Sequence, residues 1–142
     1  MKTSKELLSS IAKTAQMGQV GIRCVMEYAQ NESLKKALHS QLQEYDMIEQ
    51  EAQQIATVRG WDIQQIEPAA KFMSKAYTRA NLMVGNTDSR IAAMMINGNT
   101  KGMIKSIKNM HHGNQSDLRI RKLSEKLLSY ETANIRQMQE YL

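Results

Sequence analysis

The chain has 142 residues, a formal net charge of +5, one cysteine (Cys24), one proline and seven glycines. This length suits a single domain, residues 1–142, that can bury a core without disulfides or metals, and a lone cysteine excludes an internal disulfide. An all-β fold or a succession of βαβ units needs frequent turns, and this chain has too few glycines and prolines to form them. We therefore expect few, long helices.

The first predicted helix begins at a capping box, Thr3-x-x-Glu6, in which each side chain satisfies a free backbone N–H of the first turn. Small and apolar residues then recur at steps of three and four, which places them on one face of a helix that should run to about Gln30. Gly18 and Gly21 each weaken this helix by ~1 kcal/mol, so we expect another helix to approach closely there. The predicted face comprises Leu8, Ile11, Ala15, Gly18, Ile22, Val25 and Ala29.

A second helix should follow directly, because Asn31-Glu32-Ser33 is typical of a tight turn that caps a helix. Arg59-Gly60 is a helix-ending signal. Such a short connection between two amphipathic helices predicts an antiparallel hairpin. The predicted buried face comprises Leu34, Leu38, Leu42, Tyr45, Ile48, Ala52 and Ile55.

Residues 60–86 do not continue the long-helix pattern. Pro68 suits the first turn of a short helix, and Gly85-Asn86-Thr87-Asp88 interrupts that helix. Its apolar face comprises Ala70, Met73, Tyr77 and Ala80. This segment therefore predicts a long, partly helical crossover.

Two more long helices are predicted in the second half. One begins near Thr87 and ends at His111-His112-Gly113, and the last opens between Asn114 and Asp117. The expected face of the third long helix is Ile91, Met94, Met95, Gly98, Gly102, Ile104 and Ile107. That of the last is Ile120, Leu123, Leu127, Glu131, Asn134, Met138 and Leu142.

The helix lengths and connections together predict a topology. Four helices of about 26–28 residues each span roughly 40 Å, and the crossover can cover the same distance. Short, long and short connections indicate an all-α four-helix bundle of the ferritin-like up-down-down-up kind, with a long helical crossover between helices 2 and 3.

Three stretches carry a resemblance to a known family: Arg59-Gly60-Trp61, residues 91–102 (IAAMMINGNTKG) and residues 127–135 (LLSYETANI). They resemble ferritin-like proteins of Gram-positive bacteria that have no established function. The chain is also loosely similar to spore-coat proteins of the same fold, which have a Gly-Trp step after their second helix. The resemblance covers most of the chain and implies the fold rather than an activity.

The metal ligands of a di-iron bundle do not occur in this sequence. Such a site needs a carboxylate from each of two helices and a Glu-x-x-His pair from each of the other two. Here Glu44-x-x-Met47, Glu51-x-x-Gln54 and Glu131-x-x-Asn134 all lack the histidine. We therefore predict no metal and no cofactor.

Glu131 falls on the inward face of the last helix, where an unpaired carboxylate is costly. It needs partners, so we predict a buried polar network at mid-bundle. An inward Glu131 is explained equally well as the remnant of a former metal site. Alternatively, the last helix is rotated so that Glu131 contacts solvent. The candidate members are Glu131, Asn134, Tyr45, Asn97, Asn99 and Lys101.

The three histidines are not expected to bind metal. His111 and His112 are adjacent, so on a helix they diverge by about 100°, and their place in a last turn suits the helix dipole instead. His39 is isolated in the sequence.

Basic residues concentrate in the second half, where residues 71–142 have 12 basic and 5 acidic side chains against 7 and 9 in residues 1–70. Those around the turn between the last two helices could bind phosphates or an acidic protein, or could form a solvated face. Aromatic residues, which nucleic-acid readers interleave with basic ones, are few, so nucleic acid is not the expected partner. The basic patch comprises Lys101, Lys105, Lys108, Arg119, Arg121, Lys122 and Lys126.

Most of the eleven methionines fall at helical core spacing, where a flexible thioether fills gaps. In the alternative interpretation, Met94, Met95 and Met103 line an adaptable groove or subunit interface beside Gly98-x-x-x-Gly102, a spacing that lets another helix come close.

No catalytic motif of a hydrolase, kinase or dehydrogenase occurs in the sequence. The sequence therefore predicts a non-catalytic bundle, not an enzyme, that acts through protein surfaces in a structural or adaptor role. We expect a homodimer in the bacterial cytoplasm or spore, with no membrane segment, and an unidentified protein as the alternative partner. The alternatives are a metal-dependent ferritin-like oxidase or storage protein with a divergent site, and binding of DNA or another polyanion through the basic half.

Overall fold

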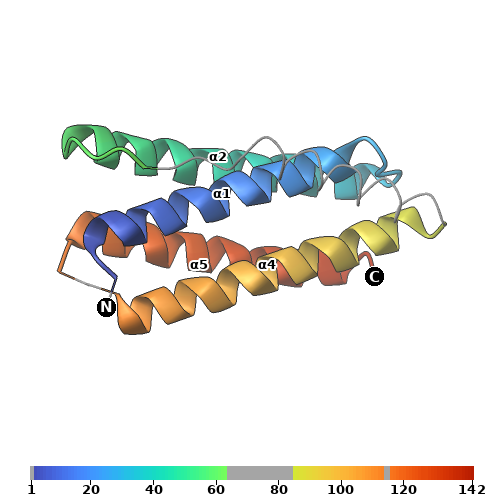
Figure 1. The fold of residues 1–142 in the computed structure, drawn as a ribbon. Coiled ribbons are helices and arrows are strands. Elements are labelled where there is room, and N and C mark those ends of the chain that lie inside the picture. Colours follow the sequence, from blue (N-terminus) through green and yellow to red (C-terminus); the bar gives the residue numbers. More distant parts are fainter. Residues whose placement is uncertain (1, 64–84, 114–115) are drawn as a thin grey trace.

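The computed structural model describes residues 2–63, 85–113 and 116–142 (Figure 1). Within these ranges the chain is helical, with one isolated bridge between Lys2 and Gly113 as its only β-type pairing. The helices are α1 (Ser4–Met26), α2 (Glu32–Val58), α4 (Thr87–His112) and α5 (Leu118–Gln139).

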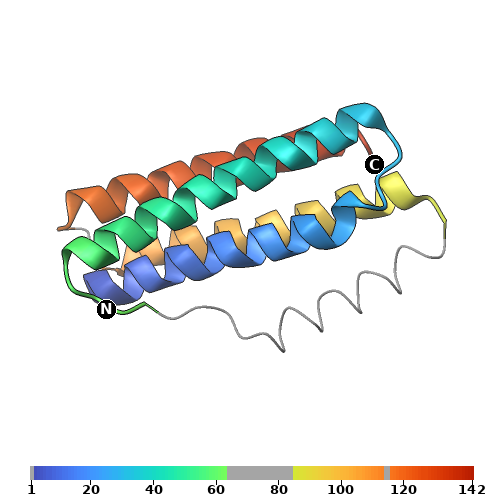
Figure 2. The same cartoon turned by 90° about the horizontal axis from the view of Figure 1, so that it is seen from above.

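The helices form two antiparallel hairpins that pack side by side into a bundle. α1 pairs with α2 and α4 pairs with α5, while α1 also lies beside α4 and α2 beside α5. Figures 1 and 2 show that α2 and α4 run in the same direction. Because α2 ends at the opposite end of the bundle from where α4 begins, the connection between them joins the two ends. The short helix predicted around Pro68 lies outside the described residues.

Side-chain caps fix three of the four helix starts. Thr3, Asn31 and Asp117 each accept a hydrogen bond from a backbone N–H in the first turn of the helix that follows. Such a cap stabilises a helix by ~1 kcal/mol because it satisfies a donor that has no partner within the helix. At the other end α1 is shorter than expected, since it stops at Met26 rather than near Gln30.

Two further contacts hold the helix ends in place. Gly60 has φ +67°, a left-handed conformation that favours glycine and ends α2. The carboxylate of Asp88 accepts hydrogen bonds from the backbone N–H groups of Gln30 (2.8 Å) and Asn31 (3.0 Å). Asp88 thereby ties the start of α4 to the turn between α1 and α2.

The predicted faces of α1, α2 and α5 are the faces that the structure buries. Among the residues predicted to be buried in the first two helices, only Gly18 and Leu42 are half-buried, and the others are buried. On α5 every residue of the predicted face up to Met138 is buried, whereas Leu142 lies beyond the helix and is 63% exposed. A contiguous apolar core from all four helices stabilises the bundle by removing this surface from water.

The predicted face of α4 is wrong over its second half. Ile104 and Ile107 are 46% and 37% exposed, and Gly98 is exposed as well. The buried face is instead polar and small in its centre and C-terminal half, where Asn99, Gly102, Ser106 and Asn109 point inward. These residues recur at steps of three and four and therefore share one face of α4. The helix is thus rotated about its axis relative to the prediction, with this small and polar face directed into the bundle.

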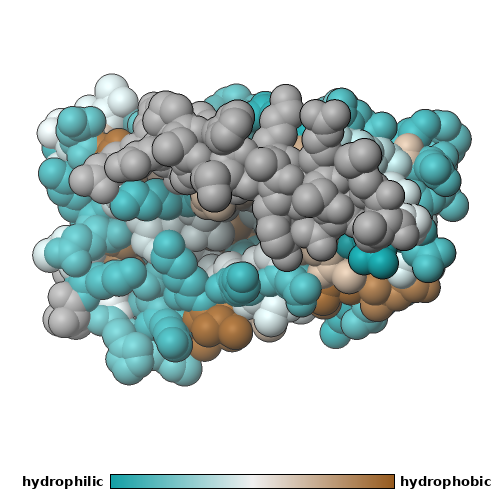
Figure 3. All heavy atoms as spheres, turned by 45° about the vertical axis from the view of Figure 1, so that its right-hand side comes forward, coloured by the Kyte–Doolittle hydropathy of each residue, from teal (hydrophilic) through white to brown (hydrophobic). Residues whose placement is uncertain are grey.

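On the face shown in Figure 3, the hydrophobic residues form a few separate patches within a largely hydrophilic surface. None of the described helices is both long and apolar enough to span a membrane.

Candidate functional site

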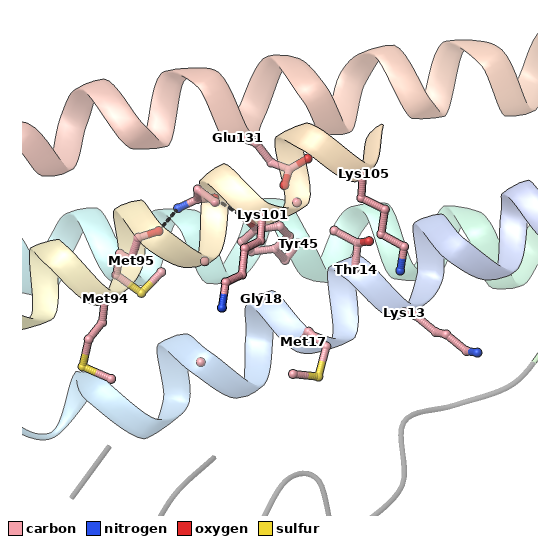
Figure 4. A pocket seen from close by; sticks show the side chains of 14 residues that line it. Lys13, Thr14, Met17, Gly18, Tyr45, Met94, Met95, Lys101, Lys105 and Glu131 are labelled. Carbon is pink, nitrogen blue, oxygen red and sulfur yellow. Dashed lines mark hydrogen bonds between the residues drawn. The ribbon is translucent and has the colours of Figure 1, made fainter. Parts of the chain in front are cut away.

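A pocket of about 520 Å³ opens between α1 and α4, and its floor is formed by side chains from α2 and α5 (Figure 4). We call it the α1–α4 pocket. Its lining residues are Lys13, Thr14, Met17, Gly18, Gly21, Tyr45, Met94, Met95, Gly98, Asn99, Lys101, Gly102, Lys105 and Glu131.

Four glycines shape this pocket in two different ways. A Cβ on Gly18 would lie 2.6 Å from the ring of Tyr45, and one on Gly102 would lie 1.7 Å from Oε2 of Glu131. These two glycines therefore make room for a buried side chain from the other helix of the same hairpin. A Cβ on Gly21 or Gly98 would meet no atom of the described residues within 4 Å, so none of the four described helices packs against these positions.

Glu131 lies at the centre of the bundle and is 0% exposed. Its Oε1 accepts a hydrogen bond from Oγ of Ser106 (3.1 Å), while Oε2 has no hydrogen-bond partner among the described residues. Burial raises the pKa of Glu131 to about 7, against the opposing effect of the Ser106 hydrogen bond. Near neutral pH this carboxyl group therefore exists in both protonation states.

Tyr45 and Asn99 form a second buried pair on the floor. The Tyr45 hydroxyl donates to Oδ1 of Asn99, whose Nδ2 in turn donates to the backbone carbonyl of Met95 (2.8 Å). Burial, and then the nearby carboxyl groups of Glu131 and Glu44, raise the pKa of Tyr45 above its ordinary value. The phenol stays protonated and acts as a fixed hydrogen-bond donor.

The two ends of the pocket differ in character. Figure 4 places Met94 and Met95 toward one end and Lys13 and Lys105 toward the other, with Lys101 between them. Both Lys101 and Lys105 are exposed, and no carboxylate of the described ranges forms an ion pair with either.

The lysine end concentrates positive charge. Partial burial, and then the positive charges of Lys2 and Lys13, lower the pKa of Lys105. Like charges crowd together at this end, so a bound anion there would relieve their repulsion.

The structure does not join the predicted network residues into one network. Asn97 and Lys101 are exposed, and Glu131 pairs with Ser106, a residue that the prediction missed. Asn134 is buried, with its Nδ2 unpartnered among the described residues. Tyr45 and Asn99 form the separate pair described above. Ser106 could have been found from its position four residues after Gly102, on the same face of the helix.

The predicted basic patch divides into two parts. Lys101 and Lys105 line the α1–α4 pocket and, with Lys108, a neighbouring hollow near Lys2 and His112. The basic residues of α5 line neither the α1–α4 pocket nor this hollow. Arg119, Arg121 and Lys122 are exposed, Arg121 lies 3.9 Å from Glu125, and the Lys126 ammonium lies 6.0 Å from the centre of the Tyr130 ring.

The histidines lie away from the pocket. His111 and His112 are exposed in the last turn of α4, with ring centres 6.3 Å apart, and His39 is exposed beside Gln43. Within the described ranges no three His, Cys, Asp or Glu side chains come together as a metal site would require.

The groups around the pocket are those of a binding site. Methionine and tyrosine side chains supply apolar contact area, and lysines supply positive charge at the mouth. The buried carboxyl group of Glu131 has one oxygen without a hydrogen-bond partner among the described residues. No protein-family model, curated protein or solved structure matches this chain.

Proposed function

We propose that this chain is a non-catalytic, ferritin-like helical bundle that binds a small, largely apolar molecule in the α1–α4 pocket. The observation that carries the proposal is the fully buried Glu131, which faces this pocket with one carboxyl oxygen unpartnered among the described residues.

The pocket's size and lining support a ligand. Small-molecule sites usually enclose about 300–1,000 Å³ and combine apolar walls with a few polar groups. The α1–α4 pocket, at about 520 Å³, lies within this range. A buried polar atom without a partner costs about 1–3 kcal/mol, so the protein keeps Glu131 at the expense of its stability. Residues retained in this way are typical of functional sites.

The arrangement of the helices supports the ferritin-like part of the proposal. Only a few residues separate α1 from α2 and α4 from α5, whereas the connection from α2 to α4 joins opposite ends of the bundle. This order corresponds to up-down-down-up with one long crossover. Proteins of this architecture build their sites from inward side chains of facing helices, which is where Glu131 and Tyr45 lie.

The test fills the pocket without disturbing the core. Gly21 and Gly98 line the pocket and have no atom of the described residues near their Cβ positions, so Gly21→Leu/Gly98→Leu places two side chains in the pocket and also improves helix propensity. Nile red, a neutral dye that fluoresces in apolar surroundings, reports occupancy. The control is Ala133→Leu, which adds the same side chain at an exposed position of α5 outside the pocket.

We expect the wild type and Ala133→Leu to bind Nile red with equal affinity and the double variant to lose about tenfold or more, since its pocket is occupied. Circular dichroism and thermal unfolding establish that the double variant is folded. Equal binding by a folded double variant would show that the dye binds elsewhere and would refute the pocket as the site.

A protein-contact role has separate support from α4. Ile104 and Ile107 are exposed at a spacing of three residues, which places them near each other on the outer surface of the helix. This apolar edge is a candidate contact for the predicted homodimer or for another protein. Analytical ultracentrifugation of the wild type and Ile104→Lys/Ile107→Lys tests it: a dimer that the variant loses supports the contact, and a monomeric wild type refutes the dimer. A cytoplasmic or spore location remains a prediction for imaging of the tagged protein.

A further inference from the structure

We infer that the ligand of the α1–α4 pocket is an anionic amphiphile, a carboxylate with an unbranched apolar chain. Its head lies at Lys101 and Lys105, and its chain lies along the methionine end. This inference rests on the proposed binding function of the pocket and adds the chemistry of what it binds.

The charges at the mouth specify the head group. Lys101 and Lys105 extend from α4 over the pocket, and Lys13 of α1 lines the same end as Lys105 (Figure 4). Within the described ranges, neither Lys101 nor Lys105 has an ion-pair partner. A cationic head would add to the repulsion among these lysines, whereas an anionic head would neutralise it.

The methionine side chains that line the pocket specify the tail. Met95 is buried, Met94 is half-buried and Met17 is 44% exposed, and all three line the pocket. Thioether side chains are unbranched and flexible, so they adapt to a flexible chain. The bare helix surfaces at Gly21 and Gly98 leave the width that such a chain requires.

The state of Glu131 modulates this binding. The charged and polar side chains that line the pocket together with Glu131 are Lys13 and Thr14 of α1, Tyr45 of α2, and Asn99, Lys101 and Lys105 of α4. Ser106 of α4 donates a hydrogen bond to Glu131, and Glu44 of α2 acts on the neighbouring Tyr45. When Glu131 is protonated, the floor is neutral and the lysines dominate the pocket. When it is ionised, its negative charge opposes a bound anion, so affinity should fall as the pH rises through about 7.

The first experiment compares three probes with the same chain and different heads: decanoate, decanol and decylamine. Each competes with Nile red below its micelle-forming concentration. We expect decanoate to bind about tenfold or more tightly than decanol, and decylamine to bind weakest. If decanol equals decanoate, or decylamine binds most tightly, the anionic head is refuted.

The second experiment removes the proposed head-group contacts. Lys101→Gln/Lys105→Gln should weaken decanoate by about tenfold, as expected for two partly exposed ion pairs, and leave decanol unchanged. The matched control is Lys108→Gln, on the same helix but outside the pocket lining. Equal decanoate affinity in the double variant and in the control would refute the lysine contacts.

The third experiment tests the link to Glu131. Between about pH 6 and about pH 8, which bracket its pKa of about 7, wild-type affinity for decanoate should fall by about fivefold or more. Glu131→Gln should bind decanoate with little pH dependence. If the same dependence persists in Glu131→Gln, another group causes it and the role of Glu131 is refuted.

The outcomes separate this inference from the proposed function. If the three probes displace Nile red with equal affinity and Gly21→Leu/Gly98→Leu abolishes binding of all three, the pocket stands and the anionic ligand fails. If the filled variant still binds decanoate as the wild type does, the pocket itself fails.

Discussion

Replacing Glu131 by glutamine should change how stability depends on pH, because this variant retains the shape of the side chain and removes its charge. In the folded protein burial raises the pKa of Glu131 from 4.5 to about 7. Below the lower value the group is protonated in both folded and unfolded chains. Between the two values the folded chain retains a proton that the unfolded chain has released, so folding becomes less favourable as the pH rises.

The magnitude follows from this interval. Each pH unit costs the wild type about 1.4 kcal/mol of unfolding free energy, which amounts to about 3 kcal/mol between pH 4.5 and about pH 7. Above about pH 7 Glu131 is ionised in both states, and the loss is complete. Glu131→Gln does not titrate and therefore avoids this loss.

Urea unfolding of both proteins at a series of pH values measures the effect. The difference between their unfolding free energies cancels all other titrating groups, including Glu44, whose pKa burial also raises. We expect this difference to move by about 3 kcal/mol in favour of Glu131→Gln between acid and neutral pH and then to level off. A difference that stays constant with pH would show that Glu131 is solvated or paired in the folded protein.

The other stability predictions concern the glycines and the tyrosine of the pocket. Gly102→Ala should destabilise the protein by ~2 kcal/mol because its Cβ would lie 1.7 Å from Oε2 of Glu131. Gly98→Ala should stabilise it by ~0.5–1 kcal/mol, since no atom of the described ranges lies within 4 Å of the added Cβ; thermal unfolding measures both, and equal shifts would contradict the packing at Gly102. Tyr45→Phe should cost ~1–2 kcal/mol because Oδ1 of buried Asn99 loses its donor, and an unchanged urea midpoint would contradict that bond.

Most helix boundaries could be predicted from the sequence because they depend on local chemistry. The caps at Thr3, Asn31 and Asp117 each satisfy a backbone N–H in the adjacent turn, and the left-handed residue at Gly60 ends α2. The inward faces of α1, α2 and α5 followed from apolar periodicity, because on these helices the buried residues are mostly apolar. The same periodicity placed Glu131 on the inward face.

The orientation of α4 could not be found in this way. Its buried residues in the central and C-terminal turns are Asn99, Gly102, Ser106 and Asn109, which have no apolar signal. The apolar Ile104 and Ile107 dominated the pattern although they face outward. Tertiary contacts turn these residues inward, since Ser106 donates to the carboxyl group of Glu131 and Asn99 accepts from the hydroxyl of Tyr45.

The α1–α4 pocket could not be predicted from the sequence either, because it forms where glycines leave parts of the helix surfaces without side chains. The sequence predicts a close helix approach at the glycines of α1 and, in the alternative interpretation of the methionines, at Gly98-x-x-x-Gly102. Gly18 and Gly102 instead accommodate single side chains, and Gly21 and Gly98 meet none of the residues that the structure describes. Which glycine does which depends on the register between helices, and a single sequence does not specify it.

Ligand binding in the α1–α4 pocket is tested most directly by NMR of protein labelled at its methionine methyl groups during titration with decanoate. The signals of Met17, Met94 and Met95, which line the pocket, should shift and saturate together. Those of Met47, which is exposed on α2, and Met138, which is buried in α5, should stay in place. Shifts at Met47 or Met138 without shifts at the pocket methionines would contradict the account.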